Sequence, residues 1–150
     1  MLGGERLSKA KGLVLASFDR AAVERAHAAL ICFGGGRADL RFGPAIPRWW
    51  NERWVEPIGG GGGTSFEIGV AAAAKLLDLA KRRNAAQECV LWVLGDGRTR
   101  DQPAKPRSAD RIVIVDCEGG DGALGRWKRL AHDWGAHYLR PEDVVAAAGR

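Results

Sequence analysis

Cysteine and long apolar runs are both scarce in this chain of 150 residues. Its three cysteines, Cys32, Cys89 and Cys117, stand far apart and form no C-x-x-C pair, which argues against a zinc ribbon and against a secreted disulfide framework. No apolar run approaches the roughly 20 residues needed to span a bilayer, and the N-terminus lacks the basic-then-apolar order of a signal peptide. We therefore expect a soluble protein of the reducing cytoplasm.

The motifs of common hydrolases are also missing. The three histidines form no H-E-x-x-H, and the chain contains no G-x-S-x-G. In the glycine run 59–63, Gly63 occupies the position where a phosphate-binding P-loop needs a lysine, so ATP hydrolysis is not expected. The chain is accordingly predicted to have no catalytic activity when it acts alone.

The charge pattern does not favour a nucleic-acid site. The formal net charge is +5 and the pI is near 9.5, but the basic residues are scattered. No aromatic residues interleave with the basic stretches 81–83 and 98–107. We expect these stretches to be solvated surface, and we predict neither a nucleic-acid nor a membrane partner.

Helical and strand patterns alternate along the chain. Apolar residues that recur every three to four positions predict helices, and short apolar runs bounded by turn residues predict strands. On this basis helices are expected at 5–25, 65–83, 124–134 and 141–148, and strands at 28–33, 38–42, 89–94, 111–115 and 137–139. The first two strands are placed for a hairpin, and the continuous apolar runs 89–94 and 111–115 are typical of strands buried on both faces.

Three tryptophans fall in residues 43–58, a segment that also holds three prolines. Such a segment is expected to be a compact connection with at most one helical turn. Trp49, Trp50 and Trp54 lie beside arginines and suit either a partner hot spot or the packing of this connection over the sheet. Both interpretations remain open.

The alternation predicts a single α/β domain over residues 1–150, with a Rossmann-like, mostly parallel open sheet and helices on both faces. In such sheets ligands bind at the carboxyl ends of the strands. Thr64 after the glycine run, Asp96 after the strand 89–94 and Asp116 after the strand 111–115 all fall on that edge. We expect the candidate site there.

Thr64 has two interpretations. With Glu67 three residues on, it forms a capping box, and its hydroxyl would then accept a backbone N–H at the helix start. Alternatively, the Thr64 hydroxyl and the Asp96 carboxylate are oxygen ligands suited to a hard cation such as Mg²⁺. Asp116 is interpreted as a strand-end residue that lines the same cleft, although Asp96 and Asp116 could act as an acid/base pair if they were adjacent.

A competing function class is a nucleotide-binding enzyme built on a Rossmann-like sheet. Gly120, Gly122 and Gly125 spell a literal G-x-G-x-x-G after a strand and before a helix, which is the context of the dinucleotide fingerprint. The motif begins several residues beyond the strand, and three nearby carboxylates would repel a pyrophosphate. This function is therefore kept as the alternative.

The order of these pieces resembles a von Willebrand factor A domain. The sequence GGGGT leads into a helix, an apolar strand ends in DGR, the next ends in VD, and GAHYLR follows. The chain is most similar to the version at the C-terminus of the D subunit of magnesium chelatase and in related cobalt-chelatase-associated proteins. The resemblance covers essentially the whole chain, with ERLSKAKG similar to the first helix and AALICFGGGRADLRFGP similar to the following hairpin.

The resemblance implies a metal-ion-dependent adhesion site for Mg²⁺ built from three segments. Its second element falls on Thr64 and its third on Asp96. The first, Asp-x-Ser-x-Ser at the end of the central first strand, is absent, since Met1 matches the residue just after its second serine. We therefore expect a sheet without its central first strand, weak or absent Mg²⁺ binding, marginal stability, and either a misassigned start codon or a fragment.

The resemblance also implies a protein partner. In this family the cation keeps one open coordination position, into which a partner inserts an acidic side chain. The expected role is a protein-interaction module, accessory to an AAA+ ATPase or to a magnesium- or cobalt-chelatase complex, whose other subunits supply the nucleotide chemistry.

Overall fold

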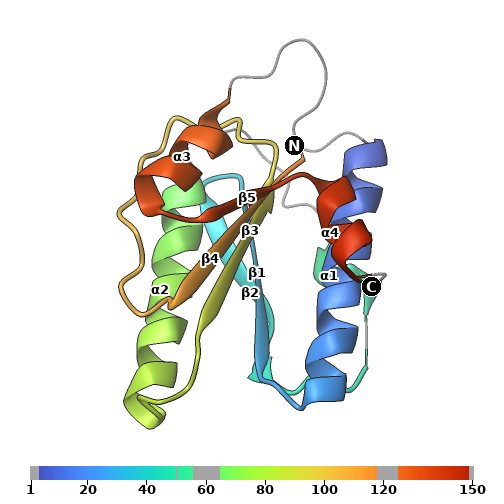
Figure 1. Ribbon diagram of the computed structural model, residues 1–150, viewed down its shortest axis with the longest axis vertical. Coiled ribbons are helices and arrows are strands. Elements are labelled where there is room, and N and C mark those ends of the chain that lie inside the picture. The colour runs from blue at the N-terminus through green and yellow to red at the C-terminus, as the bar shows by residue number, and fades with distance from the viewer. Residues whose placement is uncertain (1–3, 50, 56–64, 118–124, 149–150) are drawn as a thin grey trace.

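The computed structural model describes residues 4–49, 51–55, 65–117 and 125–148 (Figure 1). Over these residues the helices are α1 (Gly4–Glu24), α2 (Ser65–Arg83), α3 (Arg126–Trp134) and α4 (Pro141–Ala148), and the strands are β1 (Ala28–Gly34), β2 (Arg37–Ala45), β3 (Val90–Gly95), β4 (Arg111–Asp116) and β5 (His137–Leu139). A short 3-10 helix, η1 (Glu52–Val55), is the one turn expected in the tryptophan-rich connection. The predicted order of elements is confirmed. None of the helices described here has the length and apolar content needed to cross a bilayer.

The strands form two separately hydrogen-bonded sheets. β1 and β2 make the expected antiparallel hairpin, and β3, β4 and β5 make a parallel sheet in that order. The α/β class with a parallel sheet flanked by helices is thus confirmed. Within the described ranges no ladder joins β1 to β3.

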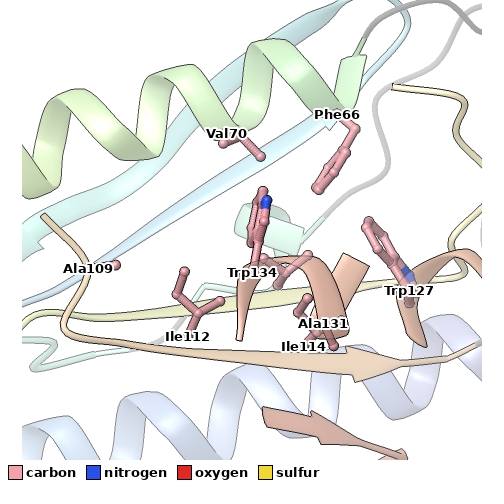
Figure 2. Packing of buried hydrophobic residues seen from close by; sticks show 9 residues of the cluster. Phe66, Val70, Ala109, Ile112, Ile114, Trp127, Ala131 and Trp134 are labelled. Carbon is pink, nitrogen blue, oxygen red and sulfur yellow. The ribbon is translucent and has the colours of Figure 1, made fainter. Parts of the chain in front are cut away.

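Helices cover both faces of the parallel sheet (Figure 1). α2 and α3 lie on one face, where they form the larger hydrophobic cluster with β3 and β4 (Figure 2). α1 and α4 lie on the other face, where Leu13 of α1 packs with Val113, Val115 and Cys117. Alternate residues of β4 therefore enter opposite clusters, as the two-residue period of a strand requires. The larger cluster consists of Phe66, Val70, Val93, Ala109, Ile112, Ile114, Trp127, Ala131 and Trp134.

The two apolar strands are buried to different degrees. In β4 every residue after Arg111 is buried, and Ile114 and Val115 have no exposed surface. In β3 only Val93 is buried, and Trp92 is 42% exposed. The expectation of burial on both faces is correct for β4 and wrong for β3. The reason is that β4 has a strand on each side, whereas β3 pairs only with β4 among the described strands.

The tryptophan-rich connection packs against α1 and the hairpin. The ring centroid of Trp54 lies 4.6 Å from that of Phe42 and 6.0 Å from that of Phe18, and Trp54 is 8% exposed. Trp49 packs on Trp54 at 4.8 Å but remains 63% exposed. Trp50 lies outside the described residues. The packing interpretation therefore holds for Trp54, and the partner interpretation stays a prediction for Trp49.

One carboxylate ties the start of the parallel sheet to the end of α2. Asp110, just before β4, accepts hydrogen bonds from Lys81 Nζ at 2.5 Å and from the backbone N–H of Cys89 at 2.7 Å. The hydrogen bond from Lys81, together with that from Cys89, holds the pKa of Asp110 below its ordinary value of 3.8. Asp110 thus links the end of α2 to the segments that lead into β3 and β4.

Asp110→Asn is expected to remove a pH-dependent part of the stability. Because the folded-state pKa of Asp110 is lowered, its contribution is present above the unfolded-state pKa and is lost as pH falls through the folded-state pKa. The difference in urea midpoint between the native protein and Asp110→Asn should be largest near neutral pH and shrink as pH falls below 3.8. Asp19→Asn, at an exposed position of α1, is the control. A difference that stays constant with pH would contradict this role.

Candidate functional site

The carboxyl ends of β1 and β3 and the start of α2 meet at one rim of the molecule (Figure 1). The backbone N–H of Gly36, in the β1–β2 turn, donates to Ser65 Oγ at 2.8 Å. The backbone N–H of Glu67 donates at 3.0 Å to Oδ2 of Asp101, which lies in the loop after β3. The first turn of α2 is therefore held both by the hairpin and by the parallel sheet, with a carboxylate at the positive end of the helix dipole.

Thr64, one of the two predicted metal ligands, lies outside the described residues, directly before α2 in the sequence. A capping box would give the N–H of Glu67 to the Thr64 hydroxyl. In the structure this N–H donates its hydrogen bond to Asp101 instead. No sequence signal pointed to Asp101, because it stands 34 positions from Glu67 and is brought there by the fold. The metal role of Thr64 stays a prediction.

Asp96, the other predicted ligand, follows β3 at this rim. Its Oδ1 accepts the backbone N–H of Arg98 at 3.0 Å, and its side chain is 12% exposed. Its Oδ2 is buried and has no hydrogen-bond partner among the described residues. The nearest described cation, Arg98 Nε, is 3.9 Å from Oδ2, which is too long for a hydrogen bond. A buried carboxylate oxygen without a hydrogen bond is costly, and this makes Asp96 the strongest candidate for holding a ligand.

Trp127 of α3 covers the backbone on either side of Asp96. A Cβ added to Gly95 or to Gly97 would lie 3.1 Å from the indole ring, and Gly97 has a φ of +70° that disfavours other residues. Trp127 is 2% exposed, its ring centroid lies 4.7 Å from that of Phe66, and its buried Nε1 has no hydrogen-bond partner in the described structure. The indole thus joins the end of β3 to the start of α2 (Figure 2).

Asp116 ends β4 and is held by a network of its own. It is 2% exposed and accepts a hydrogen bond from the Tyr138 hydroxyl at 2.5 Å. Burial raises the pKa of Tyr138, and the hydrogen bond to Asp116 raises it further. The pKa of Arg140 is also raised, mainly by its hydrogen bond to Tyr138 and in part by the charge of Asp116. These contacts favour the strand-end interpretation of Asp116 over an acid/base role.

Cys117, buried directly after β4, is the described cysteine nearest in sequence to Asp116. Burial raises the pKa of its thiol, and the negative charges of Asp116 and Asp96 add to the effect. A thiol that is kept protonated is unreactive. The described part of the rim therefore offers carboxylates, a phenol and an indole.

The described side chains fit Mg²⁺ in kind but not in number. Mg²⁺ takes about six oxygen ligands in near-octahedral geometry, and Asp96 contributes a carboxylate of the right type. Among the described residues, however, no group of three or more histidine, cysteine, aspartate or glutamate side chains could hold a metal ion. A complete site would need oxygen ligands from outside these residues.

Of the glycines in the alternative nucleotide motif, Gly120 and Gly122 lie outside the described residues. Gly125 is described and precedes α3 with a left-handed φ of 66°. A Cβ added to Gly125 would meet nothing within 4 Å, so this glycine is not kept for a close backbone approach within the described structure. No described contact favours a dinucleotide at α3.

Comparison with known proteins finds two relatives, each much longer than this chain. The chain is 29% identical over 157 residues to the uncharacterized protein Rv2850c of Mycobacterium tuberculosis, an alignment that covers 97% of this chain and 25% of that protein. It is 34% identical over 93 residues to the magnesium-chelatase 60 kDa subunit of Rhodobacter capsulatus, covering 62% of this chain and 16% of that subunit. No family model matches the chain. No solved structure matches it. The chain is thus similar to part of a chelatase subunit, and it spans a quarter or less of the length of either relative.

Proposed function

We propose that the chain is a von Willebrand factor A-type interaction module that serves as an accessory to an ATPase or a metal-chelatase complex. The observation that carries this proposal is the Oδ2 of Asp96, which lies at the carboxyl end of a parallel strand and is buried with no hydrogen-bond partner among the described residues. Open α/β sheets bind their ligands at that edge, and an unsatisfied carboxylate oxygen there suits a cation.

In this proposal Thr64 and Asp96 are the chain's own oxygen ligands for Mg²⁺, and the cation binds weakly because the described residues supply too few further ligands. When bound, Mg²⁺ would offer an open position to an acidic side chain of a protein partner. Asp101 accepts a hydrogen bond at the start of α2, and Trp127 covers the backbone at the end of β3, and both contacts lie beside the proposed site.

The similarity to a magnesium-chelatase subunit supports the class of partner. A chain without a P-loop lysine needs another subunit for nucleotide chemistry, and an AAA+ ATPase or a chelatase subunit would supply it. The module would then act in recognition and assembly rather than in the chemical step.

The cation site is tested with Mn²⁺, a paramagnetic substitute that prefers the same oxygen ligands. In nitrogen-15 NMR spectra, Mn²⁺ is expected to broaden the amide signals of Gly97, Arg98 and Phe66 first, and excess Mg²⁺ should restore them. Asp96→Ala should weaken this effect by at least about tenfold, because even groups that only support a metal ligand contribute about 10–100-fold to affinity.

Asp133→Ala is the matched control, because Asp133 is an exposed aspartate of α3 and should leave the broadening unchanged. Broadening that is equal in the native protein and in Asp96→Ala would overturn the site. A parallel titration with NAD covers the alternative function: saturating shifts at Gly125 and Arg126 at micromolar NAD would favour the nucleotide-binding enzyme.

A further inference from the structure

The loop that follows β3 is held against α3 at both ends of that helix. Arg126 Nη1, in the first turn of α3, donates to the carbonyl oxygen of Thr99 at 2.6 Å. Trp134 Nε1, in the last turn, donates to the carbonyl oxygen of Pro103 at 3.3 Å. The loop then descends beside α2 to β4 (Figure 1). The loop and α3, which β4 separates in the sequence, therefore form one continuous surface.

This surface carries an excess of positive charge. The segments 98–107 and 126–134 contain seven lysines and arginines but two aspartates, an excess of five that equals the formal net charge of the whole chain. The rest of the chain is therefore balanced in charge, and only the fold brings the two basic segments together. Except for the half-buried Arg126, their basic side chains are exposed. We call these seven residues the basic surface: Arg98, Arg100, Lys105, Arg107, Arg126, Lys128 and Arg129.

Few carboxylates neutralise the basic surface. Among the described residues only Arg98 has a carboxylate within ion-pair distance, with its Nε 3.9 Å from Oδ2 of Asp96. Asp133 of α3 is exposed, and Asp101 accepts the backbone N–H of Glu67 at the start of α2. Neither aspartate forms an ion pair with the basic surface within the described structure. Because like charges repel one another, acidic groups from another molecule would bind here favourably.

The chemistry of the surface favours carboxylates over nucleic acid. Arginine and lysine pair with carboxylates and with phosphates alike, so the neighbouring side chains decide between them. Trp127 and Trp134 of α3 are 2% and 5% exposed, which leaves no exposed aromatic side chain in these two described segments for a base to stack on. The surface also begins beside Asp96, whose Oδ1 accepts the backbone N–H of Arg98 at 3.0 Å. A partner that inserts an acidic side chain at Asp96 would thus reach it, and this choice of a protein rests on the proposed function.

We infer that the basic surface binds an acidic segment of a protein partner, rich in aspartate and glutamate, that runs from the rim along α3. The nine residues of α3 span about 14 Å. An extended polypeptide covers about 3.3 Å per residue, so a short acidic segment is long enough to contact both ends of the helix. Each exposed ion pair contributes little by itself, and the affinity comes from several pairs together. Salt therefore weakens the binding.

The test uses a labelled peptide of about ten glutamates, which is long enough when extended to span the surface. Its binding is measured by fluorescence anisotropy at low ionic strength with EDTA present. Arg100→Gln combined with Arg129→Gln should weaken binding at least about threefold, because two exposed ion pairs are lost. Arg82→Gln combined with Arg83→Gln is the matched control. It removes the same charge from exposed positions at the far end of α2 and should change the affinity by less than about twofold, because distant charges are screened.

The pair Arg100→Lys and Arg129→Lys keeps the charge and should retain binding. Equal weakening by the two glutamine pairs, or no binding of the peptide, would overturn the inference. Tighter binding of a DNA oligonucleotide of equal charge would overturn it in favour of nucleic acid. EDTA separates this inference from the proposed cation site. Peptide binding without Mn²⁺ broadening at Asp96 would refute the cation site alone, and peptide binding that requires Mg²⁺ would refute the basic surface alone.

Discussion

Trp127→Ala is expected to lower the free energy of unfolding by about 3–5 kcal/mol, the usual cost of removing a buried aromatic side chain. Trp127 is 2% exposed and packs edge-on against Phe66 while covering Gly95 and Gly97. Few other atoms could fill the cavity left by the indole, because the neighbouring residues Gly95 and Gly97 have no side chains. Since domains of this size are stable by only about 5–15 kcal/mol, the loss would be a large part of the total.

Trp127→Phe separates packing from the polar atom of the indole. It keeps a buried ring and removes Nε1, which has no hydrogen-bond partner among the described residues. An unsatisfied buried donor costs about 1–3 kcal/mol, so its removal should offset much of the lost packing, and Phe should cost less than half as much as Ala. Urea unfolding followed by far-ultraviolet circular dichroism measures both variants. Equal losses would mean that Nε1 is satisfied in solution.

Gly43→Ala is expected to cost on the order of 4 kcal/mol or more, which places it among the exceptional single substitutions. A Cβ at Gly43 would lie 2.0 Å from the carbonyl oxygen of Ala28, a backbone atom of the neighbouring strand. The backbone of β1 cannot yield without breaking the ladder in which Ala28 pairs with Ala45 and Leu30 with Phe42. The hairpin should therefore open at this end.

Gly36→Ala is the matched control for Gly43→Ala. Both glycines have a φ of +76°, but a Cβ at Gly36 would meet nothing within 4 Å. The control should show only the cost of a left-handed backbone, about 1–2 kcal/mol. The two variants are compared by the urea midpoint, and hydrogen exchange of β1 and β2 shows where the structure is lost. Similar losses for both would contradict a steric role for Gly43.

Elements with strong local patterns could be predicted closely. The alanine-rich helix α2 has the predicted bounds, 65 and 83, and the apolar run of β4 is a fully buried strand as expected. The observed ends of an element differ from the predicted ones where a single residue or a pairing with another strand sets the end. α3 begins at Arg126 rather than at 124, because Gly125 has a left-handed conformation. β2 continues to Ala45 rather than ending at Phe42, because Ala45 still pairs with Ala28.

The candidate site was predictable only in part. Asp96 follows an apolar strand, and strand ends meet at one edge in any parallel sheet, so its location at the rim needed no coordinates. Asp101 at the start of α2 and Trp127 beside Gly97 had no such signal. Both act across more than 25 positions of sequence, and only folding brings their partners to them.

Local sequence patterns were enough to predict the kind and order of the elements and the place of Asp96 at a strand end, because hydrophobic period and turn residues act over a few neighbouring positions. Contacts between distant segments were needed to show that Asp101 holds the start of α2, and that Oδ2 of Asp96 is buried with no hydrogen-bond partner among the described residues. These features depend on contacts between segments far apart in the chain, and local patterns do not encode such distances.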